Sequence, residues 1–136
     1  MDKEKLRKID ELVAIKVMGW HRKVLPGGGG GGGFTAYVDE EGKIQKFSEH
    51  PPINFCSCEV FSPSTDISDA WRVVEKLKDS GFHVSIKMPP KGKSDSCWVS
   101  VKDYYVGKYY VAYAVKTTLA ICLAALKAVC VDTAKI

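Results

Sequence analysis

Several cysteine and histidine residues have types and spacing that could support metal binding. Cys56 and Cys58 stand two positions apart, and His50 and Cys97 could complete a set of four ligands of the kinds that zinc accepts. This close spacing and the lack of a second close cysteine pair are atypical of zinc sites. Cysteines two positions apart on a strand share a face and commonly pack as thiols. We therefore expect packed or solvent-facing thiols and no bound metal.

A run of glycines, Gly27–Gly33, formally contains the G-x-G-x-x-G pattern of dinucleotide sites. Such a site needs a strand before the glycines and a helix directly after them. Here Pro26 precedes the run, and the β-prone segment 34–38 follows it. We therefore expect no nucleotide and no other cofactor, and we interpret residues 26–33 as a flexible Pro/poly-Gly loop.

Residues that could form a catalytic site are scattered. His21, His50 and His83 lie far apart in the sequence, and no Ser or Cys has a nucleophile motif around it. Asp66 and Asp69 could act as paired carboxylates, but they fall in the first turn of a predicted helix, where capping explains them. The sequence leaves enzymatic activity open, favours a non-enzymatic protein, and predicts no catalytic residue.

Positive charge is concentrated in the second half of the chain. The net charge is +4, and residues 81–136 contribute eight Lys against three Asp, with no Arg or Glu. The candidate nucleic-acid contacts are Lys87, Lys91, Lys93 and Lys116. Aromatic side chains could stack on bases, although packing against a core or a sheet is their commoner role. They are Trp71, Tyr104, Tyr105, Tyr109, Tyr110 and Tyr113. The alternative is a solvated lysine face.

Length and composition are those of one globular domain over residues 1–136. Hydrophobic residues make up 46% and charged residues 26%, and no apolar run approaches the roughly 18 residues of a membrane span. The charged start, Met1-Asp2-Lys3-Glu4-Lys5, predicts no secretory signal. An odd count of five cysteines without such a signal favours reduced thiols in a cytoplasm.

The first half of the chain predicts two helices around a hairpin. Apolar residues recur at three- and four-residue steps over 3–18, and Gly19 stands where a capping glycine belongs. Residues 34–47 read as a hairpin with a turn over 39–42. A helix then begins after the N-cap Asp66 and ends at Ser80-Gly81. Its apolar stripe predicts a buried face made of Ile67, Ala70, Trp71, Val74 and Leu77.

The second half predicts three strands and a helix. Strands are expected at 82–88, 97–102 and 108–114, and their short connections make the sheet antiparallel. A helix over 117–131 follows, with Cys122 and Cys130 on its apolar stripe and expected in the core. The fold class is therefore α+β, in the order helix, hairpin, helix, three antiparallel strands, helix. Residues 1–25 form an N-terminal helix and tail, and residues 34–136 form the α+β body.

Three segments resemble the phage and prophage proteins with a phage ABA sandwich domain. They are Val17-Met18-Gly19-Trp20, the stretch Ser64–Leu77 (the most specific of the three), and the stretch Leu119–Leu126. The likeness spans most of the chain apart from the glycine run and residues 48–60. It implies an α/β/α layered sandwich and a phage or prophage origin, hence a place in the host bacterial cytoplasm. The family has no established activity, so no catalytic residue is carried over.

Two functional hypotheses follow. The first is a phage accessory protein that is a non-enzymatic interaction protein with a protein partner or a second copy of itself, and with no membrane role. The alternative is a nucleic-acid-binding module, because the helix–three strands–helix order of 66–131 is also that of double-stranded-RNA-binding domains. In that class the lysines that open the last helix meet phosphates, and the loop between the first two strands, which here contains Lys91 and Lys93, enters a minor groove. Only Lys116 opens the last helix, and the second half lacks Arg, so the sequence disfavours nucleic acid.

Overall fold

The computed structural model describes residues 2–25, 34–47, 60–90 and 96–135. Several sequence predictions fall outside the described residues: the Pro/poly-Gly loop 26–33, the zinc candidates His50, Cys56 and Cys58, and the candidate contacts Lys91 and Lys93. The described helices are α1 (Lys3–Leu12), α2 (Ile67–Asp79) and α3 (Thr117–Ala128). The described strands are β1 (His21–Leu25), β2 (Phe34–Val38), β3 (Ile44–Phe47), β4 (Phe82–Lys87), β5 (Cys97–Asp103) and β6 (Tyr109–Ala114).

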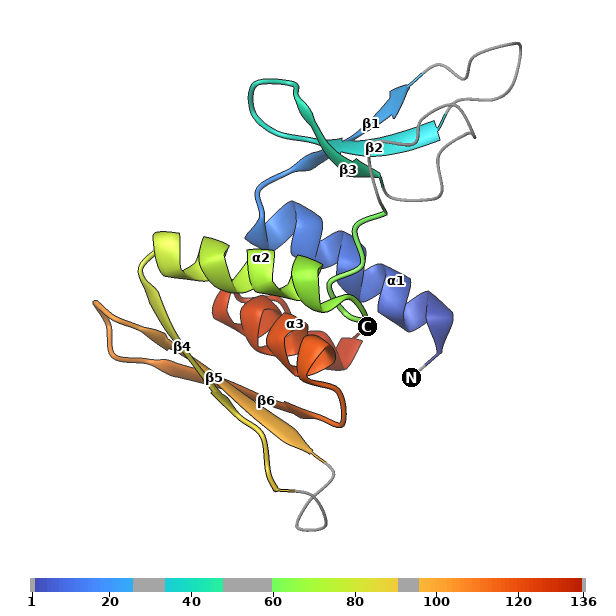
Figure 1. Ribbon diagram of the computed structural model, residues 1–136. Helices are drawn as coiled ribbons and strands as arrows, with labels where there is room; N and C mark the ends of the chain where they lie inside the picture. Colours follow the sequence, from blue (N-terminus) through green and yellow to red (C-terminus); the bar gives the residue numbers. More distant parts are fainter. Residues whose placement is uncertain (1, 26–33, 48–59, 91–95, 136) are drawn as a thin grey trace.

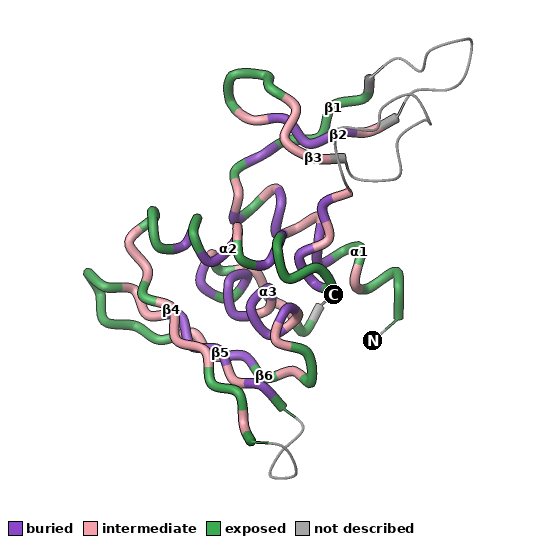
Figure 2. Tube along the Cα trace, in the orientation of Figure 1, coloured by how far each residue is buried: buried purple, intermediate pink, exposed green. Residues whose placement is uncertain are grey.

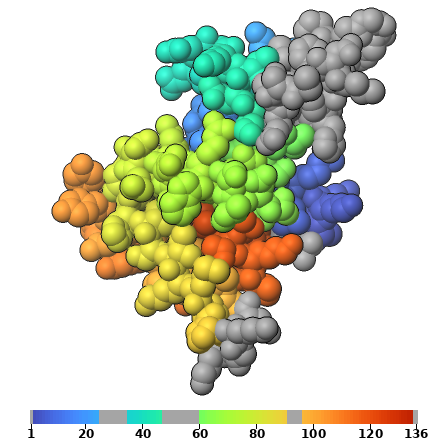
Figure 3. Space-filling view, in the orientation of Figure 1, coloured from blue at the N-terminus to red at the C-terminus, as the bar shows by residue number. Residues whose placement is uncertain are grey.

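The helices lie between two antiparallel sheets (Figure 1). One sheet has the order β4-β5-β6 and carries α2 and α3 on one of its faces. The smaller sheet, β1-β2-β3, stands on the other side of the helices and forms a lobe above the body in the space-filling view (Figure 3). This is the α+β fold that the order of patterns in the sequence predicts.

Helix α3 is the centre of the core. It contacts β5, β6, α1, α2 and the turn that follows α1, and nearly all of its length is buried (Figure 2). Small side chains let neighbouring elements approach it closely. Its fully or almost fully buried residues are Ala120, Ile121, Cys122, Ala124, Ala125, Leu126 and Ala128. Cys122 is therefore in the core as predicted, and burial raises the pKa of its thiol, which keeps it protonated.

The first predicted helix ends in a wider turn. After α1 the chain continues as a π-helical turn, Val13–Val17, in which the Met18 amide donates to the Val13 carbonyl at 3.0 Å. Gly19 then adopts φ +76°, the left-handed conformation that a capping glycine provides. This reversal places Trp20 back on the apolar side, where only 7% of it is exposed.

An aromatic cluster attaches the small sheet to the helices. The Trp20 and Phe61 rings meet edge to face with centroids 4.9 Å apart, and Tyr37 of β2 lies 6.2 Å from Phe61. The sequence predicted only the β2-β3 hairpin of this sheet and did not predict strand β1, which pairs with β2. Its five residues, His21–Leu25, alternate too weakly in polarity to read as a strand, and they pair with β2 only in the folded chain.

Helix α2 is capped as predicted, but its buried face is rotated. The Asp66 carboxylate accepts from the amides of Ser68 and Asp69, which confirms it as the N-cap. The buried residues are Asp69, Ala70, Val73, Val74 and Leu77. The prediction that Trp71 and Ile67 are core residues is wrong, because they are 53% and 58% exposed. The buried side chain of Asp69 belongs to the inner face, and this orientation turns Trp71 outward.

The last helix is shorter than predicted. It ends at Ala128, and Cys130 takes φ +64° while the Val131 amide donates to the Leu126 carbonyl at 2.9 Å. This is the pattern of a helix end closed by a left-handed residue, here without glycine. Cys130 is exposed, so its predicted place in the core is wrong.

Trp71→Ala and Trp20→Ala should differ sharply in their effect on stability. Because about half of Trp71 already faces water, its truncation should cost less than about 1 kcal/mol of unfolding free energy. Trp20→Ala removes the centre of the aromatic cluster and should cost about 3–5 kcal/mol. Urea denaturation of both variants measures this. Equal losses would contradict the rotated face of α2.

Candidate functional site

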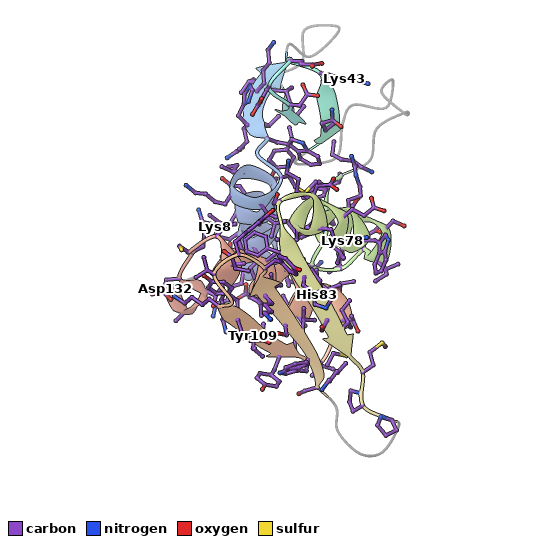
Figure 4. The ribbon with its side chains drawn as sticks, turned by 90° about the vertical axis from the view of Figure 1, so that its left-hand side faces the viewer. Lys8, Lys43, Lys78, His83, Tyr109 and Asp132 are labelled. Carbon is purple, nitrogen blue, oxygen red and sulfur yellow. The ribbon has the colours of Figure 1, made fainter. Side chains whose placement is uncertain are left out.

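The face of the β4-β5-β6 sheet that points away from the helices is the most unusual surface of the described structure. The side chains that alternate with the core-facing ones lie there, and no described element packs on it. We call it the outer sheet face. Its residues are His83, Ser85 and Lys87 of β4, Trp98, Ser100 and Lys102 of β5, and Tyr109, Val111 and Tyr113 of β6. Figure 4 turns this side of the molecule toward the viewer and labels His83 and Tyr109.

Strand register arranges these side chains in three rows across the sheet. Lys87 pairs with Trp98, and Trp98 pairs with Tyr113. At the other end of the strands His83 pairs with Lys102, which pairs with Tyr109. The central row is Ser85, Ser100 and Val111, and Ser100 is only 4% exposed because the larger rows on either side cover it.

Each lysine on this face lies over an aromatic ring. Lys87 Nζ is 4.8 Å from the centre of the Trp98 ring, and Lys102 Nζ is 5.3 Å from that of Tyr109. Such pairs are favourable by about 0.5–1 kcal/mol where they are exposed. Tyr109 and Tyr113 are 60% and 66% exposed. The outer sheet face therefore presents aromatic rings and positive charge together, and none of its nine residues is acidic.

The hairpin between β5 and β6 extends this surface. The Asp103 carboxylate accepts from the amides of Tyr105 and Val106 at 3.0 and 3.2 Å, so it is turned toward the hairpin backbone. The hairpin thereby exposes Tyr104 and Tyr105, whose rings are nearly perpendicular with centroids 6.0 Å apart. A shallow recess of about 210 Å³ lies beside them, and its lining includes Lys78 and His83.

The predicted nucleic-acid contacts are only partly brought together. Lys87 lies on the outer sheet face, whereas Lys116 stands at the start of α3, across the sheet at the same end of the strands. Lys116 lines a groove of about 460 Å³ with Leu6, Leu119 and Tyr113. These two lysines form no continuous stripe. Sequence reasoning missed Lys102 and Trp98. Lys102 lies beside Tyr109, and Trp98 beside Lys87, only because of the strand register.

Two buried carboxylates form a second cluster, beneath the segment 62–66. Asp10 Oδ1 accepts from the Ser64 amide and Asp69 Oδ2 from the Ser62 amide, both at 2.9 Å. Lys46 Nζ lies 3.6 Å from Asp69 Oδ1, and the Thr118 hydroxyl donates to the Ser64 carbonyl at 2.7 Å. This network ties α1, α2, α3 and β3 to one segment.

This cluster is structural in character. Burial raises the pKa of Asp10 from 3.8 to about 6; the Ser64 amide and hydroxyl act against this, and the charge of Asp69 adds to it. A carboxyl with a raised pKa can serve as a general acid where substrate reaches it. Asp10 is 9% exposed and Asp69 2%, and neither lines the groove beside Ser64. Asp69 therefore does more than favour the start of α2, which is the role that the sequence predicted for it.

No metal cluster and no membrane helix occur in the described part of the chain. No group of three or more His, Cys, Asp or Glu side chains is placed to hold a metal ion among residues 2–25, 34–47, 60–90 and 96–135. Cys97 is buried and lies 3.1 Å from the Thr117 hydroxyl, and it is a free thiol. Within the same ranges, no helix has both the length and the apolar character that crossing a membrane requires.

Comparison with known proteins gives one match. The family described as the phage ABA sandwich domain matches residues 11–126, which include all of the outer sheet face. No curated protein matches the chain, and no solved structure matches it.

The raised pKa of Asp10 predicts a specific pH dependence. The folded state holds the proton of Asp10 more tightly than the unfolded chain does. The contribution of Asp10 to the free energy of unfolding is therefore fully present below about pH 4 and is lost as pH rises through about 6. The loss is at most about 3 kcal/mol. Asp10→Asn keeps an oxygen for the Ser64 amide and cannot ionise, so its stability relative to wild type should rise between about pH 4 and 6. Urea denaturation at several pH values measures this, and a constant difference would contradict it.

Proposed function

Because the chain belongs to the phage ABA sandwich domain family, we propose that it is a phage accessory protein that acts by binding rather than by catalysis, in the host cytoplasm. Its partner is a negatively charged macromolecule, and the outer sheet face is where that partner docks. The observation that carries the proposal is the exposure of Tyr109 and Tyr113, with the half-buried Trp98, beside Lys87 and Lys102 on a sheet face that no described element covers.

The composition of this face is not what solubility alone requires. An antiparallel sheet with one solvated face ordinarily alternates apolar residues inside with polar residues outside. Here the outside positions carry large aromatic rings, which are the residues that most often anchor interfaces. Exposed rings gathered on one face mark a binding surface more strongly than rings scattered singly. The positive charge beside them selects an acidic partner and opposes a second copy of the same face.

Double-stranded RNA is a second candidate partner, favoured by topology. The order α2, β4, β5, β6, α3, with both helices on one face of the sheet, is that of double-stranded-RNA-binding domains. In that class the start of the last helix meets phosphates. Lys116 is the lysine that precedes α3, and it lines a groove with Tyr113 rather than lying on the outer sheet face. Of the three lysines expected to contact a duplex, only Lys116 lies among the described residues, so the outer sheet face supports the proposal better.

Site-specific cross-linking in host cells tests the docking face. A photoreactive residue at Tyr113 should yield covalent adducts of discrete size, because this side chain is exposed among the proposed contacts. The same residue at Trp71 is the matched control, since Trp71 is an exposed aromatic on α2, outside the outer sheet face. Adducts from both positions alike, or from neither, would contradict the proposal. Digestion of the adducts with nuclease or protease identifies the class of partner.

A further inference from the structure

We infer that the macromolecule that docks on the outer sheet face is single-stranded nucleic acid. This inference rests on the proposed function and names the class of the partner. The face combines the two features that such binding uses. One is a set of aromatic rings on which unpaired bases stack, and the other is positive charge that follows the backbone phosphates.

The rings are spaced for more than one base. Tyr109 and Tyr113 lie on the same face of β6 four residues apart, which is about 14 Å along a strand. Trp98 lies on the neighbouring strand directly opposite Tyr113. A sheet with exposed rings on adjacent strands can stack two or three bases of a single strand, because every base has a flat face whatever its sequence.

The cations stand beside the rings that would hold bases. Lys87 and Lys102 each place an ammonium group within about 5 Å of a ring centre, on opposite ends of the face. His83 lies in the same row as Lys102 and Tyr109. Because each ammonium group lies over a ring face, a base that stacks on Trp98 or Tyr109 must displace the lysine from that face, and the flexible lysine can then reach the adjoining phosphate.

Other occupants fit less well. In a duplex the bases are stacked on one another and cannot reach the rings of Tyr109 and Tyr113. A second copy docked face to face would set Lys87 and Lys102 against their own like charges. An acidic protein segment would satisfy the lysines but would leave the flat aromatic faces without planar partners. The charge and the rings together therefore favour unpaired bases joined by phosphates.

Fluorescence anisotropy with a labelled single strand of about 10 nucleotides tests the inference. At about 50 mM salt we expect a dissociation constant of about 1–100 µM for single-stranded DNA or RNA, and weaker binding of duplexes of the same length. Tyr109→Ala and Tyr113→Ala should each weaken binding about 5- to 150-fold, the loss expected for one stacked base. Both tyrosines are largely exposed, so the variants should fold, and unchanged thermal unfolding verifies this. Trp71→Ala is the matched control and should bind like wild type.

The salt dependence of binding distinguishes the contribution of Lys87 and Lys102 from that of the protein's other positive charges. Two phosphate contacts on a single strand predict a log–log slope of about −1.4. Replacing both Lys87 and Lys102 with Gln should remove most of that slope, whereas replacing Lys8 of α1 and Lys76 of α2 should leave it.

Two outcomes would overturn the inference: no binding of single strands at about 50 mM salt, or binding that is indifferent to Tyr109 and Tyr113. If the Tyr113 cross-link in cells then gives adducts that only protease removes, the partner is a protein and the proposed function stands without this inference. If Tyr113 gives no adduct and single strands do not bind, both fail.

Discussion

Burial of α3 on nearly all sides is the constraint on which the rest of the structure depends. The helix lies beside α2 on the β4-β5-β6 sheet and also contacts α1 and the turn that follows α1, and the alanines at positions 120, 124, 125 and 128 let these neighbours come close. Larger side chains there would push the layers apart at a cost of about 1–3 kcal/mol each. The apolar side chains of α3 that do not face the sheet also need apolar neighbours. For this reason α1 and α2 lie on the same side of the sheet as α3.

That arrangement leaves the opposite face of the sheet to solvent. Strand alternation commits Val99 and Val101 to the core and Trp98, Ser100 and Lys102 to the outside, so folding fixes which positions face out but not which residues fill them. At the β6 edge, Lys127 Nζ donates to the Val111 carbonyl at 2.8 Å, so one acceptor of this edge strand is already paired and a charged side chain stands beside it.

The sequence predicted the parts of the fold that local chemistry decides. The Asp66 cap, the Gly19 reversal and the alternation of β4 to β6 each follow from a few neighbouring residues, and each is confirmed. The errors concern tertiary choices. Trp71 lies on the edge of a plausible apolar stripe, and only the buried role of Asp69 decides which way α2 turns. The rows of the outer sheet face likewise depend on register, which the spacing of single residues does not reveal.

The carboxylate network gives the stretch 64–77 a central role in the fold. Residues 64–77 contain Ser64, whose amide is held by Asp10 and whose carbonyl is held by Thr118, each 54 positions away in the chain. They also contain Asp66 and Asp69, which cap α2 and fix the segment before it. These residues join three helices, so their chemistry serves folding. Their role in the fold is therefore separate from the chemistry of the outer sheet face, which β4, β5 and β6 supply.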